Sequence, residues 1–295
     1  MLATRTTIFV VGATYTSPAT IQLGARAFTL TSDHATMMGG APMVSSSPGT
    51  TTNVTMRALT LGVPNVTAKS LVVSGSTLTL QDVTIEQPFQ VDNVGSLLIE
   101  SSTIDAAGIT SATTSITRST VHAGITVTGG SLRYDSNHFA SSSSVAITKP
   151  NTGGDVQVVD SVFVTSGTAP VIAFTDIAKL AFCTFVTTQA TSIAAVACAG
   201  PAVATISSSI EAWNTLDGGC STTHSLFAGS SPPGGTGNIA APVTSIFVDL
   251  AGGDYRPNAT SAARGQGDPT APGADHDING ASRPATPDDG AYEVP

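Results

Sequence analysis

Apolar and polar residues alternate in short runs, and these runs recur along the chain. Each run reads apolar–x–apolar–x–x–small–x–apolar, as in LTLQDVTI (78–85) and LLIESSTI (97–104). A period of two is typical of a short strand with one buried face. The second apolar position falls at residues 61, 80, 99, 116, 134, 158, 180, 205 and 222. These steps of about 20 residues lie within the range of solenoid repeats.

A unit this short cannot bury a core of its own, but stacked units bury a continuous one. Neighbouring strands would then pair in parallel, about 4.8 Å apart. The small position is mostly Ser or Asn between residues 83 and 225, and such residues can hydrogen-bond along a stack. No helical periodicity lasts beyond two turns, and the units are not joined by the Asn-Gly or Asp-Gly turns of an antiparallel sandwich. We therefore expect an all-β chain, a right-handed parallel β-helix of about nine to ten turns.

Three regions are expected from this pattern. Residues 1–50 read as opening strands or an N-terminal cap, residues 51–230 as the repeats, and residues 231–295 as a loop-rich tail packing on the last turn. Because the open ends of a solenoid expose unpaired strand edges, we expect both end segments to cap the solenoid.

The repeat and the tail together resemble the pectin-lyase-like β-helix proteins, in particular secreted or surface proteins of bacteria. The tail motifs that carry this resemblance are Phe247 to Asp249, Gly253 to Arg256, Ser261 to Gly265, Arg283-Pro284 and Asp289 to Glu293. The resemblance implies a β-helix fold at the cell surface or outside the cell. It implies little about activity, since many such proteins have no assigned reaction.

The amino-acid composition argues against several classes of function. Charged residues make up 11% of the chain, against about 25% in an ordinary soluble domain. The net charge of −9 would repel nucleic acid and anionic lipid. No apolar run approaches the roughly 18 residues of a membrane span, and the N-terminus lacks a signal-peptide pattern. The high Ser and Thr content favours an extracellular setting.

The three cysteines leave at least one thiol unpaired. Cys198 and Cys220 lie in loop-like, glycine-containing stretches and are candidates for a disulfide, with two free thiols as the alternative. Cys183 stands inside an apolar run and reads as a buried thiol.

The candidate catalytic residues follow the last apolar residue of successive units. Glu86, Asp105 and His122 would lie side by side on consecutive turns, and two carboxylates near 5 Å apart suit a retaining glycosidase. The histidine could move protons or join a metal site. The alternative is a solvated polar face. Arg118, in a second column, resembles the basic residue of pectate-lyase sites, but the acids around it are too sparse to form the calcium cluster of those sites.

Two further candidates concern ligands. Asp275, Asp277 and Asn279 begin a D-x-D-x-N-G calcium loop, but Thr286 stands where the final acid is expected. The alternative is a turn-rich tail segment. Trp213, the single tryptophan, could stack on a sugar ring or pack half-buried.

The leading expectation is a non-enzymatic extracellular β-helix scaffold for adhesion or glycan binding, with no cofactor unless calcium binds the tail. One alternative is a polysaccharide lyase or glycoside hydrolase that uses Glu86, Asp105, His122 and Arg118. The other is a purely structural module of a longer surface protein.

Overall fold

The computed structural model describes residues 5–11, 14–17, 21–23, 27–39, 44–46, 53–62, 71–73, 75, 77–141, 145–150, 153–167, 170–175, 177–187, 195–198, 204–212 and 220–295. The chain divides into two compact units, Met1–Leu132 and Arg133–Pro295. Each unit is described by itself.

The fold is an all-β parallel solenoid, as predicted, with about seven turns instead of the predicted nine to ten. Among the described residues, the 3₁₀ turn η1 (Val243–Ser245) is the only helical segment. The first predicted repeat, at residues 59–66, is wrong in its placement. Leu59 and Leu61 pair with Val83 and Ile85, so they form the second half of a turn that begins at Val54.

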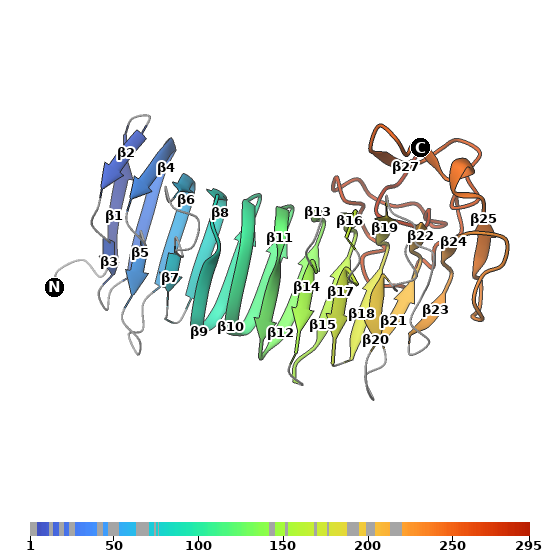
Figure 1. The fold of residues 1–295 in the computed structure, drawn as a ribbon, viewed down its shortest axis with the longest axis horizontal. Coiled ribbons are helices and arrows are strands. Elements are labelled where there is room, and N and C mark those ends of the chain that lie inside the picture. The colour runs from blue at the N-terminus through green and yellow to red at the C-terminus, as the bar shows by residue number, and fades with distance from the viewer. Residues whose placement is uncertain are drawn as a thin grey trace. The chain divides into compact units, whose positions relative to one another are not determined.

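The first unit combines long strands with short ones (Figure 1). They are β1 (Arg5–Val10), β2 (Thr14–Ser17), β3 (Ile21–Leu23), β4 (Ala27–Gly39), β5 (Val44–Ser46), β6 (Asn53–Gly62), β7 (Leu71–Val73), β8 (Thr77–Ile85), β9 (Phe89–Glu100), β10 (Thr103–Thr117) and β11 (Thr120–Thr128). Each pairs in parallel with its counterpart one turn away. Inward residues stack in columns, such as Leu30, Met56, Leu80, Ile99 and Ile116. All five are buried.

A left-handed residue makes one corner of each turn. The positive-φ positions include Asp82, Ser101, Arg118, Ser136, Asp160, Phe182, Ser208 and His224. Arg118, which the sequence analysis placed in a second column, is one of these residues, so that column marks the bend of the chain. A non-glycine residue with positive φ is uncommon, so its recurrence turn after turn indicates that the stacked strands impose it.

The small residue that follows a corner links neighbouring turns through hydrogen bonds of its side chain. Ser102 Oγ accepts the N–H of Val83 at 3.1 Å and donates to the carbonyl of Glu100 at 2.8 Å. In the second unit, Ser161 Oγ bonds the N–H of Asn137 and the carbonyl of Val159 in the same way. The expected ladder thus runs from side chain to backbone, which satisfies buried backbone groups at each bend.

From β12 onward the strands are short, with three to five residues each. They are β12 (Ser131–Asp135), β13 (His138–Ser141), β14 (Ile147–Lys149), β15 (Val156–Val159), β16 (Val162–Thr165), β17 (Ile172–Phe174), β18 (Ala178–Ala181), β19 (Thr184–Thr187), β20 (Val196–Cys198), β21 (Ala204–Ser207), β22 (Ile210–Ala212), β23 (Ser221–Thr223), β24 (Leu226–Ala228), β25 (Ile239–Ala241), β26 (Phe247–Asp249) and β27 (Asp254–Pro257). The last two pair antiparallel, whereas strands β13 to β25 pair in parallel.

An aromatic stack fills the core of the second unit. Phe163 pairs with Phe139 and Phe185, and the rings of Phe163 and Phe185 stack with centroids 5.1 Å apart. The next residue in this register is Glu211, which pairs with Phe185 on one side and Phe227 on the other. The predicted unit at residues 205–210 was therefore placed one residue too early, because an acid occupies the aromatic position.

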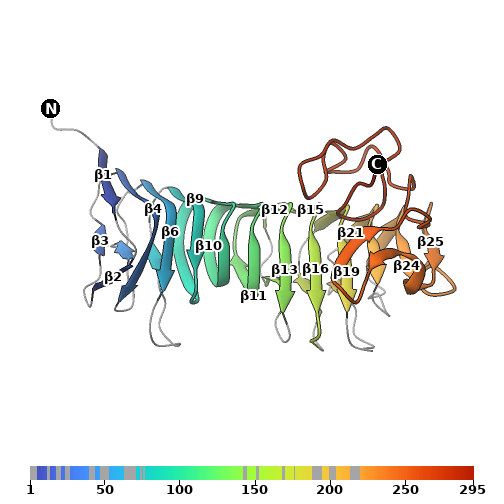
Figure 2. The ribbon, with the colours of Figure 1, turned by 90° about the horizontal axis from the view of Figure 1, so that it is seen from above.

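The C-terminal tail (residues 231–295) lies along the side of several turns of the second unit (Figures 1 and 2). Its Ala291 N–H donates to Thr184 Oγ1 at 3.0 Å, and its Asp268 N–H donates to Ser208 Oγ at 2.8 Å. Ile246 and Phe247 of the tail pack with Val186, Ile210 and other buried residues. The tail thus covers outward apolar side chains of the strands as well as the last turn.

Candidate functional site

The candidate catalytic residues Glu86, Asp105 and His122, which we call the acid column, lie on consecutive turns of the first unit. Glu86, Asp105 and His122 each follow one member of the paired series Ile85, Ile104 and Val121. Glu86 and His122 are exposed and Asp105 is half-buried. The β10–β11 ladder shifts register just after Ile104. These three side chains do not converge as metal ligands, because the described residues hold a single such group and it lies elsewhere.

Arg118 is an exposed corner residue of the first unit. Its guanidinium forms an ion pair with Glu100, and its backbone has a φ of 49°. Its position therefore reflects the bend of the chain, and the structure gives no lyase-type cluster around it within the described residues.

Directly beside the acid column runs a feature that the sequence reasoning missed, a ladder of threonines. The paired residues are Thr14, Thr36, Thr60, Thr84, Thr103 and Thr120, from β2, β4, β6, β8, β10 and β11. None of these side chains is buried. The signal was present in the sequence, because each of the last three precedes the final apolar residue of its repeat, in VTIE, STID and STVH.

A second, shorter ladder lies on another side of the same unit. It consists of Thr7, Thr29, Thr55 and Thr79. The next residue in register is Leu98, so the run of hydroxyls ends there. We call the six-residue series the long threonine ladder and the four-residue series the short threonine ladder.

The positions equivalent to the acid column are apolar in the second unit, where Val164, Val186 and Ala212 replace the acids and histidine. The positions equivalent to the long ladder are mixed: Val162 and Ile210 are apolar, whereas His138 and Thr184 are polar. The tail covers this surface. The contrast indicates that the same side of the repeat serves tail packing in one unit and is left polar in the other.

The second unit holds the only three-residue cluster of ligand atoms among the described residues. His276 Nε2 of the tail lies 3.2 Å from Asp135 Oδ1 of β12 and 3.8 Å from Asp160 Oδ2, at the corner after β15. All three ligand atoms lie within 4.8 Å of one another. The tail thus places an imidazole against two carboxylates of the solenoid.

The electrostatics of this cluster are unusual. Burial raises the pKa of Asp160 to about 8, although the charge and hydrogen bond of Arg283 act to lower it. Burial alone would lower the pKa of His276, but its hydrogen bond to Asp135 and the charge of Asp160 raise it overall. The carboxyl group of Asp160 and the imidazole of His276 therefore both hold a proton more tightly than they would in water.

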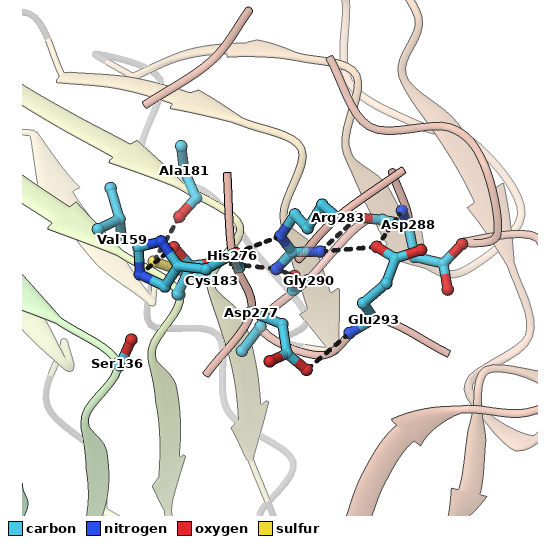
Figure 3. Close-up of polar contacts among 12 residues, drawn as sticks. Ser136, Val159, Ala181, Cys183, His276, Asp277, Arg283, Asp288, Gly290 and Glu293 are labelled. Carbon is cyan, nitrogen blue, oxygen red and sulfur yellow. Dashed lines mark hydrogen bonds and ion pairs between the residues drawn. The ribbon is translucent and has the colours of Figure 1, made fainter. Parts of the chain in front are cut away.

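Arg283 of the tail motif is the anchor beside the cluster. Its side chain is fully buried, and its Nη2 donates to Asp160 Oδ1 at 2.8 Å and to the carbonyl of Gly290 at 2.9 Å. Figure 3 shows its guanidinium among Gly290, Asp288 and Glu293. It also lies over the Phe182 ring, 4.2 Å from the centroid. The Arg283-Pro284 motif of the tail is therefore explained by the buried contacts of Arg283, which anchor the tail to the second unit.

The predicted calcium loop adopts a different arrangement. Asp277 Oδ1 accepts the N–H groups of Asn279 and Ala281, and its Oδ2 accepts the N–H of Glu293. Asp275 turns to His276, with 3.1 Å from Oδ1 to Nδ1. Asp277 and Asn279 thus lie in a local turn, and calcium binding there stays a prediction.

The remaining candidates have simpler outcomes. Cys198 and Cys220 form a disulfide, and Cys183 is a buried free thiol. Trp213 lies outside the described residues. A cavity of about 700 Å³ in the tail is lined in part by Arg264, whose guanidinium is already bonded to the carbonyls of Val294 and Pro295.

A scan against protein-family models found no match, and a search of curated proteins found no significant match. The structure supports the β-solenoid part of the resemblance, and the pectin-lyase-like family and its tail stay predictions. Among the described residues, no helix is long and apolar enough to cross a membrane.

Proposed function

We propose that this protein is a non-enzymatic β-solenoid scaffold that binds a neutral, extended polysaccharide along the long threonine ladder. The uncovered ladder is the observation that carries the proposal. Each threonine hydroxyl can donate and accept a hydrogen bond, while its methyl group offers an apolar contact. Repetition at about 4.8 Å suits a ligand that is itself a repeating polymer.

The scaffold supplies rigidity, which lowers the entropic cost of binding. Thr84 and Thr103 are fixed by parallel pairing on adjacent turns, and β-branched side chains have few rotamers. The neighbouring Glu86 and Asp105, with a net charge of −9 for the chain, disfavour an acidic glycan. A neutral glycan is therefore the preferred ligand class.

The disulfide between Cys198 and Cys220 supports a location outside the cytosol, because disulfides persist in oxidising compartments. We propose a secreted or cell-surface protein on this basis.

A glycan screen tests the proposal against its enzymatic rival. The full chain is incubated with neutral and acidic polysaccharides, and both saturable binding and release of reducing ends or unsaturated products are followed. Saturable binding to a neutral glycan without turnover is expected. Turnover that disappears in a Glu86→Gln, Asp105→Asn variant would replace the scaffold with a carbohydrate-active enzyme, and absence of binding to every glycan would refute the proposal.

A further inference from the structure

The cluster of Asp135, Asp160 and His276 has the form of a prepared ligand set. His276 Nε2 points at one oxygen of each carboxylate, at 3.2 Å and 3.8 Å. Zinc ligands lie about 2.1 Å from the ion, so two ligands at a tetrahedral angle are roughly 3.4 Å apart. These two separations therefore need adjustments of only a few tenths of an ångström, and the third, between the two carboxylate oxygens, is within 4.8 Å.

The far end of each ligand is held by another side chain. Arg133 Nη2 donates to Asp135 Oδ2 at 2.5 Å, and Arg283 Nη2 donates to Asp160 Oδ1 at 2.8 Å. Asp275 Oδ1 lies 3.1 Å from His276 Nδ1. A carboxylate on the second nitrogen of a histidine is the usual support of a metal-bound imidazole, because it fixes the tautomer and the ring.

One atom of the cluster lacks a hydrogen-bond partner. Asp160 is completely buried, and its Oδ2 makes no hydrogen bond. A buried carboxylate oxygen without a partner is costly. Asp135 Oδ1 also accepts from Ser136 Oγ at 2.9 Å, which leaves it a further lone pair. The unpartnered oxygen faces His276, the position where an ion would complete its bonding.

We propose that Asp135, Asp160 and His276 bind a divalent transition-metal ion, with Zn²⁺ as the fitting ion. One imidazole nitrogen and two carboxylate oxygens match zinc, whereas calcium and magnesium prefer oxygen ligands alone. The ion would join the tail to two turns of the second unit. It would act as a structural clamp, independent of the threonine ladder.

Titration calorimetry of the full chain, after removal of metal with a chelator, tests the site with ZnCl₂ alone. We expect one Zn²⁺ per chain, binding at least 100-fold weaker in Asp160→Asn and in His276→Gln, and unchanged binding in His34→Gln, which alters an exposed histidine of β4. Asp275→Asn should weaken binding about 10-fold, because it removes the support and keeps the ligands.

Circular dichroism of each variant establishes that it is folded, and limited proteolysis reports on the tail. Zn²⁺ should slow cleavage within the tail of the wild type and leave the Asp160→Asn and His276→Gln variants unprotected. The absorption spectrum of the Co²⁺-loaded wild type provides a signature that does not depend on any variant. Failure of the wild type to bind Zn²⁺, binding that persists in both ligand variants, or a preference for Ca²⁺ would overturn the proposal.

Discussion

Glu211 should make the stability of the second unit fall as the pH rises. Its carboxyl group is buried within the aromatic column, and neither oxygen has a hydrogen-bond partner. Burial raises the pKa of Glu211 from 4.5 to about 8. Between these two values the folded chain holds one proton more than the unfolded chain, so the stabilisation present below the lower value is lost as the pH rises through the higher one.

The size of the effect follows from the shift. One pKa unit corresponds to about 1.4 kcal/mol, so this single group lowers the free energy of unfolding by about 2.5 kcal/mol between pH 5 and pH 7. The Glu211→Gln variant has nearly the same shape and cannot ionise. Its stability relative to the wild type should therefore grow by about 2.5 kcal/mol over the same interval.

Urea unfolding at pH 5, 6 and 7, followed by circular dichroism, measures this difference. Comparison with the wild type cancels the other buried acids, since these remain in both proteins. Glu86→Gln, which alters an exposed carboxylate, is the matched control. A difference between Glu211→Gln and the wild type that stays constant from pH 5 to pH 7 would refute the reasoning.

Three further predictions concern what holds the second unit together. Arg283→Gln should lower the free energy of unfolding by about 3–5 kcal/mol, because it removes the buried partner of Asp160 and Glu293, whereas Arg256→Gln, on an exposed pair, should leave the free energy of unfolding nearly unchanged; equal losses in urea melts would contradict this. Phe163→Ala should cost about 3–5 kcal/mol, and a loss below about 1 kcal/mol would show that the aromatic stack is not a packed core. Replacing Cys198 and Cys220 by Ser should cost about 2–4 kcal/mol, and equal stability with and without a reductant in the wild type would contradict the bridge.

Much of the fold could be predicted from sequence because its core repeats. The alternation at Leu78 and Leu80 defines strand, face and period together, and stacking follows from the shortness of the unit. The predicted register is wrong near Glu211, because an acid occupies the position where the pattern requires an aromatic residue. The fold therefore tolerates a buried carboxylate that the hydrophobic pattern cannot reveal.

The candidate sites were harder to predict. Asp135 and His276 are 141 positions apart, and no periodic pattern connects the tail to the strand it covers. Arg118 was predicted to be catalytic because of its charge, but its column marks the left-handed corner of the turns. The long threonine ladder was visible in the repeats, yet threonine is common in strands, and its register became clear only with the strand pairing.

The most direct test of the glycan-binding surface compares two triple variants in one binding assay. Thr84→Val, Thr103→Val and Thr120→Val remove three hydroxyls of the long threonine ladder while keeping β-branched side chains. Thr29→Val, Thr55→Val and Thr79→Val do the same on the short threonine ladder. Three lost hydrogen bonds at about 1 kcal/mol each predict an affinity about 100-fold weaker for the first variant. The second variant should bind the neutral glycan as the wild type does. Equal affinity of both variants and the wild type would contradict the assignment of the long threonine ladder as the binding surface.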